Sequence, residues 1–314
     1  MAKPYDVLVV GSYSIDLVFT GLPHMPPLGM EVLASGFEML PGEAYTGAVA
    51  MHRLGLQVGW AGDFGNDSFS RFALECARKE GLDERLFVHH KRPLRRISVA
   101  ASFPQDRAFL TYYDPDPRLP AAVKALTITA ARLLYVPGFF CGPLFDGGVK
   151  LARARGMRIV MDANTGGSIS LSEDEEGIFT AQAVRHAVQS VDLLLANARE
   201  ARCLTGEEDL EKAIWVLGEH CPLVVVKDGA NGAYAWQAGT RLHAPTLPVQ
   251  PLDTTGAGDC FNAGFIKAWL DGLSLEECLR WGNVVGALST LARGGTGRMI
   301  TTEEVRRKLK DLPV

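Results

Sequence analysis

The chain has 314 residues, of which 47% are hydrophobic and 22% are charged, a composition that supports a large buried core and excludes global disorder. The formal net charge of −4 argues against nucleic acid or an anionic membrane as the main partner, so we expect a small soluble ligand.

The six cysteines show no Cys-x-x-Cys spacing, which indicates reduced core thiols and neither a disulfide framework nor a zinc site. Residues 1–12 have no basic segment followed by a long apolar stretch, and no window approaches 18 unbroken apolar residues. We therefore expect a cytoplasmic protein with no membrane partner.

Short apolar runs alternate along the chain with longer amphipathic segments. The predicted strands are residues 6–12, 57–63, 132–138, 158–164, 191–197 and 223–229. The predicted helices are residues 67–80, 144–155, 181–190, 208–219, 258–271 and 275–292. Continuous apolar strands separated by helices predict an α/β domain, in which a mostly parallel sheet is covered on both faces. Ligands of such sheets bind outside the carboxyl ends of the strands.

Residues 17–40 and 88–114 break this pattern because they alternate like strands without helices between them. The second segment resembles a hairpin that turns at residues 104–106. We interpret both as a small antiparallel sheet that projects as a lid from a single domain spanning residues 1–314. The alternative is that they are edge strands of the main sheet.

The stretch "DTTGAGDCF" (253–261) joins a strand-like segment to a segment with helical periodicity. Gly256, Ala257 and Gly258 therefore lie at a helix N-terminus, where the first N–H groups have no intrahelical partner and the helix dipole is positive. Glycines let a ligand approach this backbone closely. The pattern predicts a cradle for an anion such as phosphate.

Asp259 follows in the first helical turn. Its simplest role is to stabilise the helix dipole, by about 0.3–1 kcal/mol. Beside a bound phosphate, however, a carboxylate would repel the ligand unless it accepted a proton. An anion cradle next to a base is typical of phosphoryl transfer to a hydroxyl. A Walker A loop and a dinucleotide-binding Gly-x-Gly-x-x-Gly motif are both absent from the sequence.

The stretch "DTTGAGDCFNAGF" resembles the C-terminal signature of the PfkB, or ribokinase-like, family of carbohydrate and nucleoside kinases. The resemblance extends through nearly the whole chain in "VVGSYSIDLVF", "AGDFGNDSFSRFALECARKEGLD", "NARE", "VVVKDGANGAY" and "WGNVVGALSTLARGG". It implies a Rossmann-like three-layer α/β sandwich with a β lid, which uses ATP and Mg²⁺ to phosphorylate a hydroxyl.

The resemblance also implies roles for individual residues. Asp259 would be the catalytic base, and Gly256, Ala257 and Gly258 would form the anion hole. The nucleotide site would contain Asn197, Lys227, Gly229, Gly232 and Asn283. Glu200 would hold Mg²⁺ through water, and a monovalent cation such as K⁺ would lie near Asp253, Thr255 and Gly294. The alternatives are that Asn197 and Glu200 only cap a helix and that Lys227 lies on the surface.

The substrate site implied by the resemblance contains Asp16, with Ser14, Gly42, Glu43 and Thr46 nearby. This chain departs from the family pattern here. Pro41-Gly42 stands in place of a glycine pair, and Thr46 stands where asparagine is expected. A carboxylate at Glu43 would accept hydrogen bonds from hydroxyls and repel anions, which favours a neutral sugar, polyol or nucleoside.

Two alternatives remain open from the sequence. An arginine of residues 89–96 could bind an acidic sugar such as 2-keto-3-deoxygluconate, although a solvated basic surface on the lid is the favoured interpretation of this cluster. The altered signature could also mark a non-catalytic nucleotide- or sugar-binding member of the family. Because the lid is an open sheet, we expect a homodimer that pairs through it.

Overall fold

An eight-stranded sheet forms the centre of the protein, in the order β14-β13-β12-β11-β10-β9-β1-β4. The computed structural model describes residues 4–103, 107–115, 120–164 and 180–310. Neighbouring strands from β4 to β12 are parallel, and β13 and β14 add an antiparallel edge. The strands are β1 (Tyr5–Val10), β4 (Val58–Ala61), β9 (Ala131–Val136), β10 (Arg158–Asp162), β11 (Leu193–Asn197), β12 (Leu223–Lys227), β13 (Ala233–Gln237) and β14 (Thr240–Ala244).

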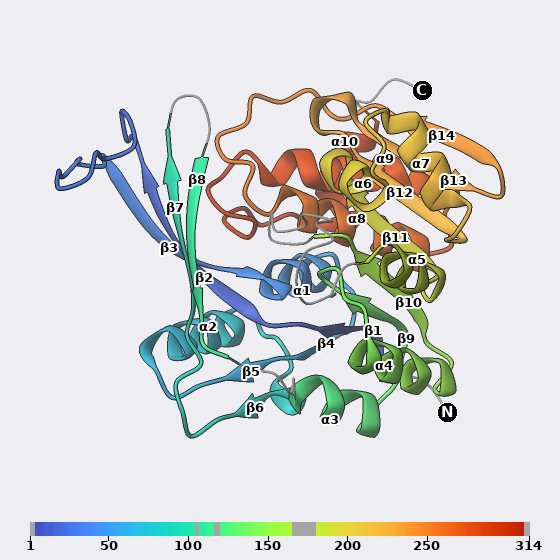
Figure 1. Cartoon of the computed structure of the whole chain (residues 1–314), viewed down its shortest axis with the longest axis horizontal. Coiled ribbons are helices and arrows are strands. Elements are labelled where there is room, and N and C mark those ends of the chain that lie inside the picture. The colour runs from blue at the N-terminus through green and yellow to red at the C-terminus, as the bar shows by residue number, and fades with distance from the viewer. Residues whose placement is uncertain (1–3, 104–106, 116–119, 165–179, 311–314) are drawn as a thin grey trace.

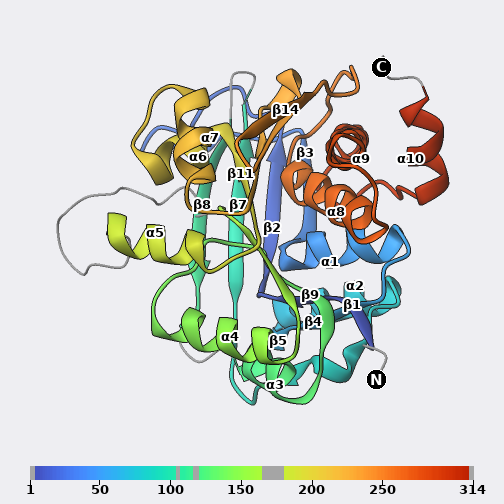
Figure 2. The ribbon, with the colours of Figure 1, turned by 90° about the vertical axis from the view of Figure 1, so that its right-hand side faces the viewer.

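Helices cover both faces of this sheet, so the domain has the predicted three layers (Figure 2). One face packs against α1 (Ala44–Arg53), α2 (Ser68–Lys79), α8 (Ala257–Leu270), α9 (Leu275–Ser289) and α10 (Thr302–Leu309). The other face packs against α3 (Pro120–Ile128), α4 (Pro143–Ala154), α5 (Ala181–Gln189), α6 (Ala198–Thr205) and α7 (Leu210–Gly218). The six predicted helices are confirmed, with ends that shift by up to three residues.

Alternation along each strand divides the core into two clusters. On β11, Leu193 and Leu195 pack toward α8 and α9, whereas Leu194 and Ala196 pack toward the helices of the opposite face. This follows from the pleat, because successive side chains of a strand point to opposite faces. The same alternation decides which polar residues at the strand ends face α8.

The lid is a separate four-stranded sheet that projects from the main domain (Figure 1). Its order is β3 (Gly36–Glu43), β2 (Tyr13–Thr20), β7 (Arg96–Ser102) and β8 (Arg107–Tyr113). The outer pairs are antiparallel as predicted, but β2 and β7 run parallel. The predicted turn at 104–106 lies outside the described residues.

The lid segments differ from their predicted bounds at both ends. Strand β2 begins at residue 13 and β3 ends at residue 43, so the lid strands run directly into the main domain. The short strands β5 (Asp63–Phe64) and β6 (Val88–His89) pair with each other and not with the lid. Within the described residues, no helix is both long and apolar enough to span a bilayer.

Candidate active site

Four neighbouring strands of the main sheet carry a polar residue at or next to their carboxyl ends, on the face that packs against α8. Each of these residues lies two positions after a core residue of that face, so its side chain points the same way. The last residues of β10, β11 and β12 are Asp162, Asn197 and Lys227, and Tyr135 is the last but one of β9. Asn197 pairs directly with Lys227 in the sheet. The fold thus gathers side chains that are far apart in the sequence.

Helix α8 begins next to these strand ends, since a Cβ atom at Gly258 would lie 3.5 Å from Nζ of Lys227. Its N-cap is Gly256, in the left-handed conformation with φ 72°. A Cβ atom there would lie 2.6 Å from Cα of Gly295, so the position favours glycine both for its backbone angle and for its close packing. The N–H of Ala257 donates to the carbonyl of Thr254 at 3.2 Å, which closes the turn. The next N–H groups, of Gly258 and Asp259, follow in the first turn of the helix.

Asp259 lies in a crowded acidic environment. Burial, followed by the charge of Asp162, raises the pKa of Asp259 to about 8, with Glu200 and Glu43 adding to the rise and Lys227 opposing it. Burial and the charge of Asp162 likewise raise the pKa of Glu200 to about 7. A cation that binds beside these carboxyl groups would stabilise their ionised form and lower their pKa values.

A buried ion pair lies beneath the start of α8. Nζ of Lys227 donates to Oδ2 of Asp162 at 2.9 Å and to Oδ1 of Asn262 at 3.1 Å. The amide of Asn262 donates in turn to Asp162 and, at 3.0 Å, to the hydroxyl of Tyr135. The alternative of a surface Lys227 is wrong, since only 13% of its side chain is exposed. Nothing in the sequence marked Tyr135 or Asn262 as members of this cluster.

Asn197 and Glu200 form a capping box at the start of α6. The N–H of Glu200 donates to Oδ1 of Asn197 at 2.8 Å, and the N–H of Asn197 donates to Oε2 of Glu200 at 2.7 Å. The capping role weighed from the sequence is therefore confirmed. It does not exclude a ligand, because a carboxylate has further lone pairs and that of Glu200 also faces the acidic cluster.

The lid contributes a second group of polar residues. Oγ of Ser14 donates to Oδ1 of Asp16 at 3.2 Å. Burial, followed by the charge of Glu43, raises the pKa of Asp16 to about 6. Gly42 lies directly against both side chains, since a Cβ atom there would be 2.6 Å from Oδ2 of Asp16 and 2.8 Å from Oγ of Ser14.

Glu43 links the lid to α1. Its backbone has φ 55° and ψ −132°, a region that residues other than glycine rarely adopt, and it stands at the N-cap of α1. The hydroxyl of Tyr113, on lid strand β8, donates to the Glu43 carboxylate. Arg96 stacks over the Tyr113 ring at 5.1 Å, and its buried Nε has no hydrogen-bond partner among the described residues. The sequence gave no signal for Tyr113.

The remaining predicted residues occupy loops around the cluster. Thr46 is only 2% exposed and packs against Gly256 and Gly295, so it supports the loop before α8. Asp253 accepts hydrogen bonds from the hydroxyl of Thr255 at 2.7 Å and from the N–H of Gly294 at 2.8 Å. These bonds bring together the three residues predicted to surround a monovalent cation.

The predicted nucleotide residues beyond Asn197 and Lys227 lie on the β12–β13 turn and on α9. Gly229 and Gly232, with φ 54° and 90°, form the turn between β12 and β13. The side-chain amide of Asn283, on α9, donates to the carbonyls of Ala244 at 2.8 Å and Pro245 at 3.2 Å. The structure therefore gives this buried amide a protein partner.

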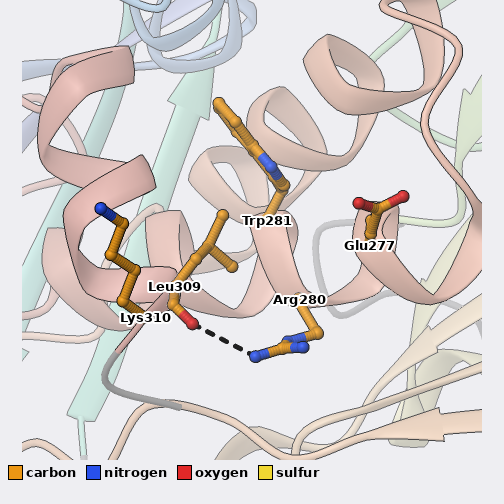
Figure 3. A pocket seen from close by; sticks show the side chains of 5 residues that line it. All are labelled: Glu277, Arg280, Trp281, Leu309 and Lys310. Carbon is orange, nitrogen blue, oxygen red and sulfur yellow. Dashed lines mark hydrogen bonds between the residues drawn. The ribbon is translucent and has the colours of Figure 1, made fainter. Parts of the chain in front are cut away.

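A cavity of about 170 Å³ lies between α9 and the end of α10 (Figure 3). Arg280 lines it and donates to the carbonyl of Leu309 at 3.2 Å. The other lining residues are Glu277, Trp281 and Lys310. This cavity shares no residue with the cluster around Asp259 and does not form part of the candidate active site.

Comparisons with known proteins agree with this geometry. The sequence profile of the pfkB family carbohydrate kinases matches residues 5–302. The chain is 28% identical to ribokinase from Bacillus subtilis (strain 168) over 308 residues, which cover 97% of this chain and 99% of that protein. It is also 28% identical to 2-dehydro-3-deoxygluconokinase from the same organism over 300 residues, which cover 88% of each chain.

The fold has a solved counterpart. The structure of a ribokinase II from E. coli, in complex with ATP and Mg²⁺, superposes with a TM-score of 0.76 at 21% identity and covers 98% of this chain and 99% of that one. The profile match spans both the lid and α8. The chain therefore belongs to the pfkB family of carbohydrate kinases, as a ribokinase-fold sugar or nucleoside kinase.

Proposed function

We propose that this kinase transfers the γ-phosphoryl group of ATP to a hydroxyl of a small neutral sugar, polyol or nucleoside. The observation that carries the proposal is the placement of Asp259, a half-buried acid with a raised pKa in the first turn of α8, next to the Gly256–Gly258 amides. The carboxylate takes the proton of the attacking hydroxyl. The new bond joins the substrate oxygen to phosphorus, the bond from phosphorus to the β-phosphate oxygen breaks, and ADP leaves.

ATP and Mg²⁺ suit the residues present. The positive end of α8 is oriented to stabilise phosphate charge, and the acids of the cluster have raised pKa values that a divalent cation would lower. When bound, Mg²⁺ neutralises charge on the phosphates. Glu200 would hold it through water, and Asn197 would help to orient those waters. The nucleotide site would be lined by Lys227, Gly229, Gly232 and Asn283. The side chain of Asn283 would take part through atoms that do not bond to the carbonyls of Ala244 and Pro245.

A monovalent cation such as K⁺ would lie near Asp253, Thr255 and Gly294. Support comes from the convergence of these three residues beside the loop that begins α8. The Asp253 carboxylate already orders that loop through hydrogen bonds. A cation bound there would act by fixing the loop that presents the anion cradle.

The substrate would lie between the lid and α8, held by Asp16, Ser14, Gly42 and Glu43, with Thr46 acting through its packing. The carboxylates of Asp16 and Glu43 would accept hydrogen bonds from hydroxyls, whereas a bound anion would raise their already raised pKa values further. The acidic-sugar alternative has one specific observation in its favour: Nε of Arg96, beside Tyr113, has no hydrogen-bond partner in the part of the chain that the structure describes.

The test is ATP consumption measured against a panel of acceptors that includes ribose, fructose, adenosine, inositol and 2-keto-3-deoxygluconate. We expect ADP release to rise above the hydrolysis background with a neutral acceptor. A rise with 2-keto-3-deoxygluconate alone would favour the acidic-sugar alternative. No rise with any acceptor, in a protein that binds ATP, would favour a non-catalytic binding role.

The lid also supports a proposal about assembly. It exposes large apolar side chains, with Leu110 at 68% and Tyr112 at 53% exposure, and these two lie on one face because they are two positions apart on β8. A second copy of the chain packed against this face would bury these apolar side chains and so stabilise a dimer. Light scattering should give the mass of two chains, and Leu110→Asp should reduce it toward that of one.

A further inference from the structure

The side chain of Lys227 is held in one orientation by partners on two other elements of the fold. Its ammonium group is held between Asp162 on β10 and Asn262 on α8, at 2.9 and 3.1 Å. Asn262 cannot rotate freely, because its Nδ2 donates to the Tyr135 hydroxyl and to Asp162, which leaves Oδ1 facing the lysine. Three elements thus fix the position of one cation.

The ammonium group has three N–H donors, and two of them are used by these partners. Among the described residues no partner takes the third. Nζ lies 3.5 Å from the point where a Cβ atom of Gly258 would stand. The remaining donor is therefore next to the anion cradle, and glycine at 258 keeps the space between them open.

The charge of Lys227 also acts on the acids around it. Burial disfavours its ammonium, but the carboxylates of Asp162 and Glu200 outweigh that effect and hold the pKa of Lys227 above its usual value. The lysine therefore stays charged at neutral pH. It is the cation that opposes the rise in the pKa of Asp259.

We propose that Lys227 is a catalytic residue that donates its third N–H to the phosphoryl group while that group is being transferred, and that Asp162 and Asn262 are positioning residues that aim it. This inference rests on the proposed kinase function. As the phosphoryl group moves from ADP to the substrate oxygen, its three equatorial oxygens carry negative charge that a preorganised donor stabilises. The substrate proton goes to Asp259, and Lys227 keeps its own proton throughout.

The experiment compares Lys227→Met with the wild type by calorimetry, with Mg²⁺ present, titrating ADP alone and ADP with aluminium fluoride, which mimics the phosphoryl group in transfer. We expect the wild type to bind ADP more tightly when aluminium fluoride is present. In Lys227→Met, the factor by which aluminium fluoride increases the affinity for ADP should be smaller by on the order of 10²-fold. The affinity of this variant for ADP alone should change by less than about threefold. The kcat with a working acceptor should fall by a similar factor, with little change in the KM for ATP.

A control is needed because Lys227→Met leaves Asp162 buried and unpaired, which can unfold the protein. The double variant Lys227→Met with Asp162→Asn removes both charges, and Asp162→Asn alone is its reference. The inference is supported if aluminium fluoride tightens ADP binding by Asp162→Asn but not by the double variant. The inference is overturned if aluminium fluoride tightens ADP binding equally in Lys227→Met and the wild type, or equally in the double variant and Asp162→Asn. Lys227 would then be only a structural partner of Asp162. A wild type that binds ADP but shows no gain overturns the proposed function, and the inference with it.

Discussion

A Cβ atom at Gly42 would lie 2.6 Å from Oδ2 of Asp16 and 2.8 Å from Oγ of Ser14. Both contacts are to the ends of side chains, so an alanine could be accommodated only if the Asp16 carboxylate turned away. The glycine therefore sets the position of the acid that we propose binds substrate hydroxyls.

Gly42→Ala should raise the KM for the acceptor at least about tenfold, because one well-placed charge-assisted hydrogen bond contributes roughly 1.5–3 kcal/mol. The melting temperature should change little. Gly147→Ala is the matched control, since a Cβ atom at this position on α4 would meet nothing within 4 Å. An unchanged acceptor KM in a Gly42→Ala protein would show that Asp16 does not bind the substrate.

Asp16 should reduce stability at neutral pH. Its pKa rises from 3.8 to about 6 in the folded protein, so the folded state binds the proton more tightly than the unfolded state. Stability is therefore lost as the pH rises from about 4 to 6, by up to about 3 kcal/mol. Asp16→Asn should unfold at higher denaturant concentration than the wild type at pH 7.5, and the difference should vanish near pH 4. A variant less stable than the wild type at pH 7.5 would contradict this account.

The pH dependence of catalysis should reflect Asp259. A base works when it has lost its proton, and the pKa of Asp259 in the free protein is about 8. The kcat/KM for the acceptor at low Mg–ATP should therefore rise about tenfold per pH unit up to pH 8 and then level off. Bound cations favour the ionised carboxylate, so the kcat profile at saturating Mg–ATP should level off at lower pH. A flat kcat/KM profile between pH 6 and 8 would contradict the prediction.

The sequence predicted features that depend on nearby residues. The apolar runs of the parallel strands and the periodicity of α2 or α8 are local patterns, and Gly256–Asp259 is one continuous motif at a strand-to-helix junction. Helix α1 was not predicted, because eight of its ten residues are buried and no polar face reveals its period.

Contacts between distant segments could not be predicted in the same way. Lys227 and Asp162 are 65 positions apart, and their ion pair depends on which strands are neighbours in the sheet. Tyr113 contacts Glu43 from 70 positions away, although their strands β8 and β3 form the two opposite edges of the lid sheet. The parallel pairing of β2 with β7 has the same origin, since alternation identifies a strand but does not indicate its direction.

The most direct test of the central claim is the turnover of Asp259→Asn with an acceptor that the wild type phosphorylates. The amide keeps the size of the side chain but cannot accept the hydroxyl proton. We predict that kcat falls at least about 10²-fold while the dissociation constant for ATP stays within about threefold of the wild-type value. Asp271→Asn is the control, because this acid is the C-cap at the other end of α8 and pairs there with Lys267. Turnover near the wild-type rate in Asp259→Asn would contradict the claim.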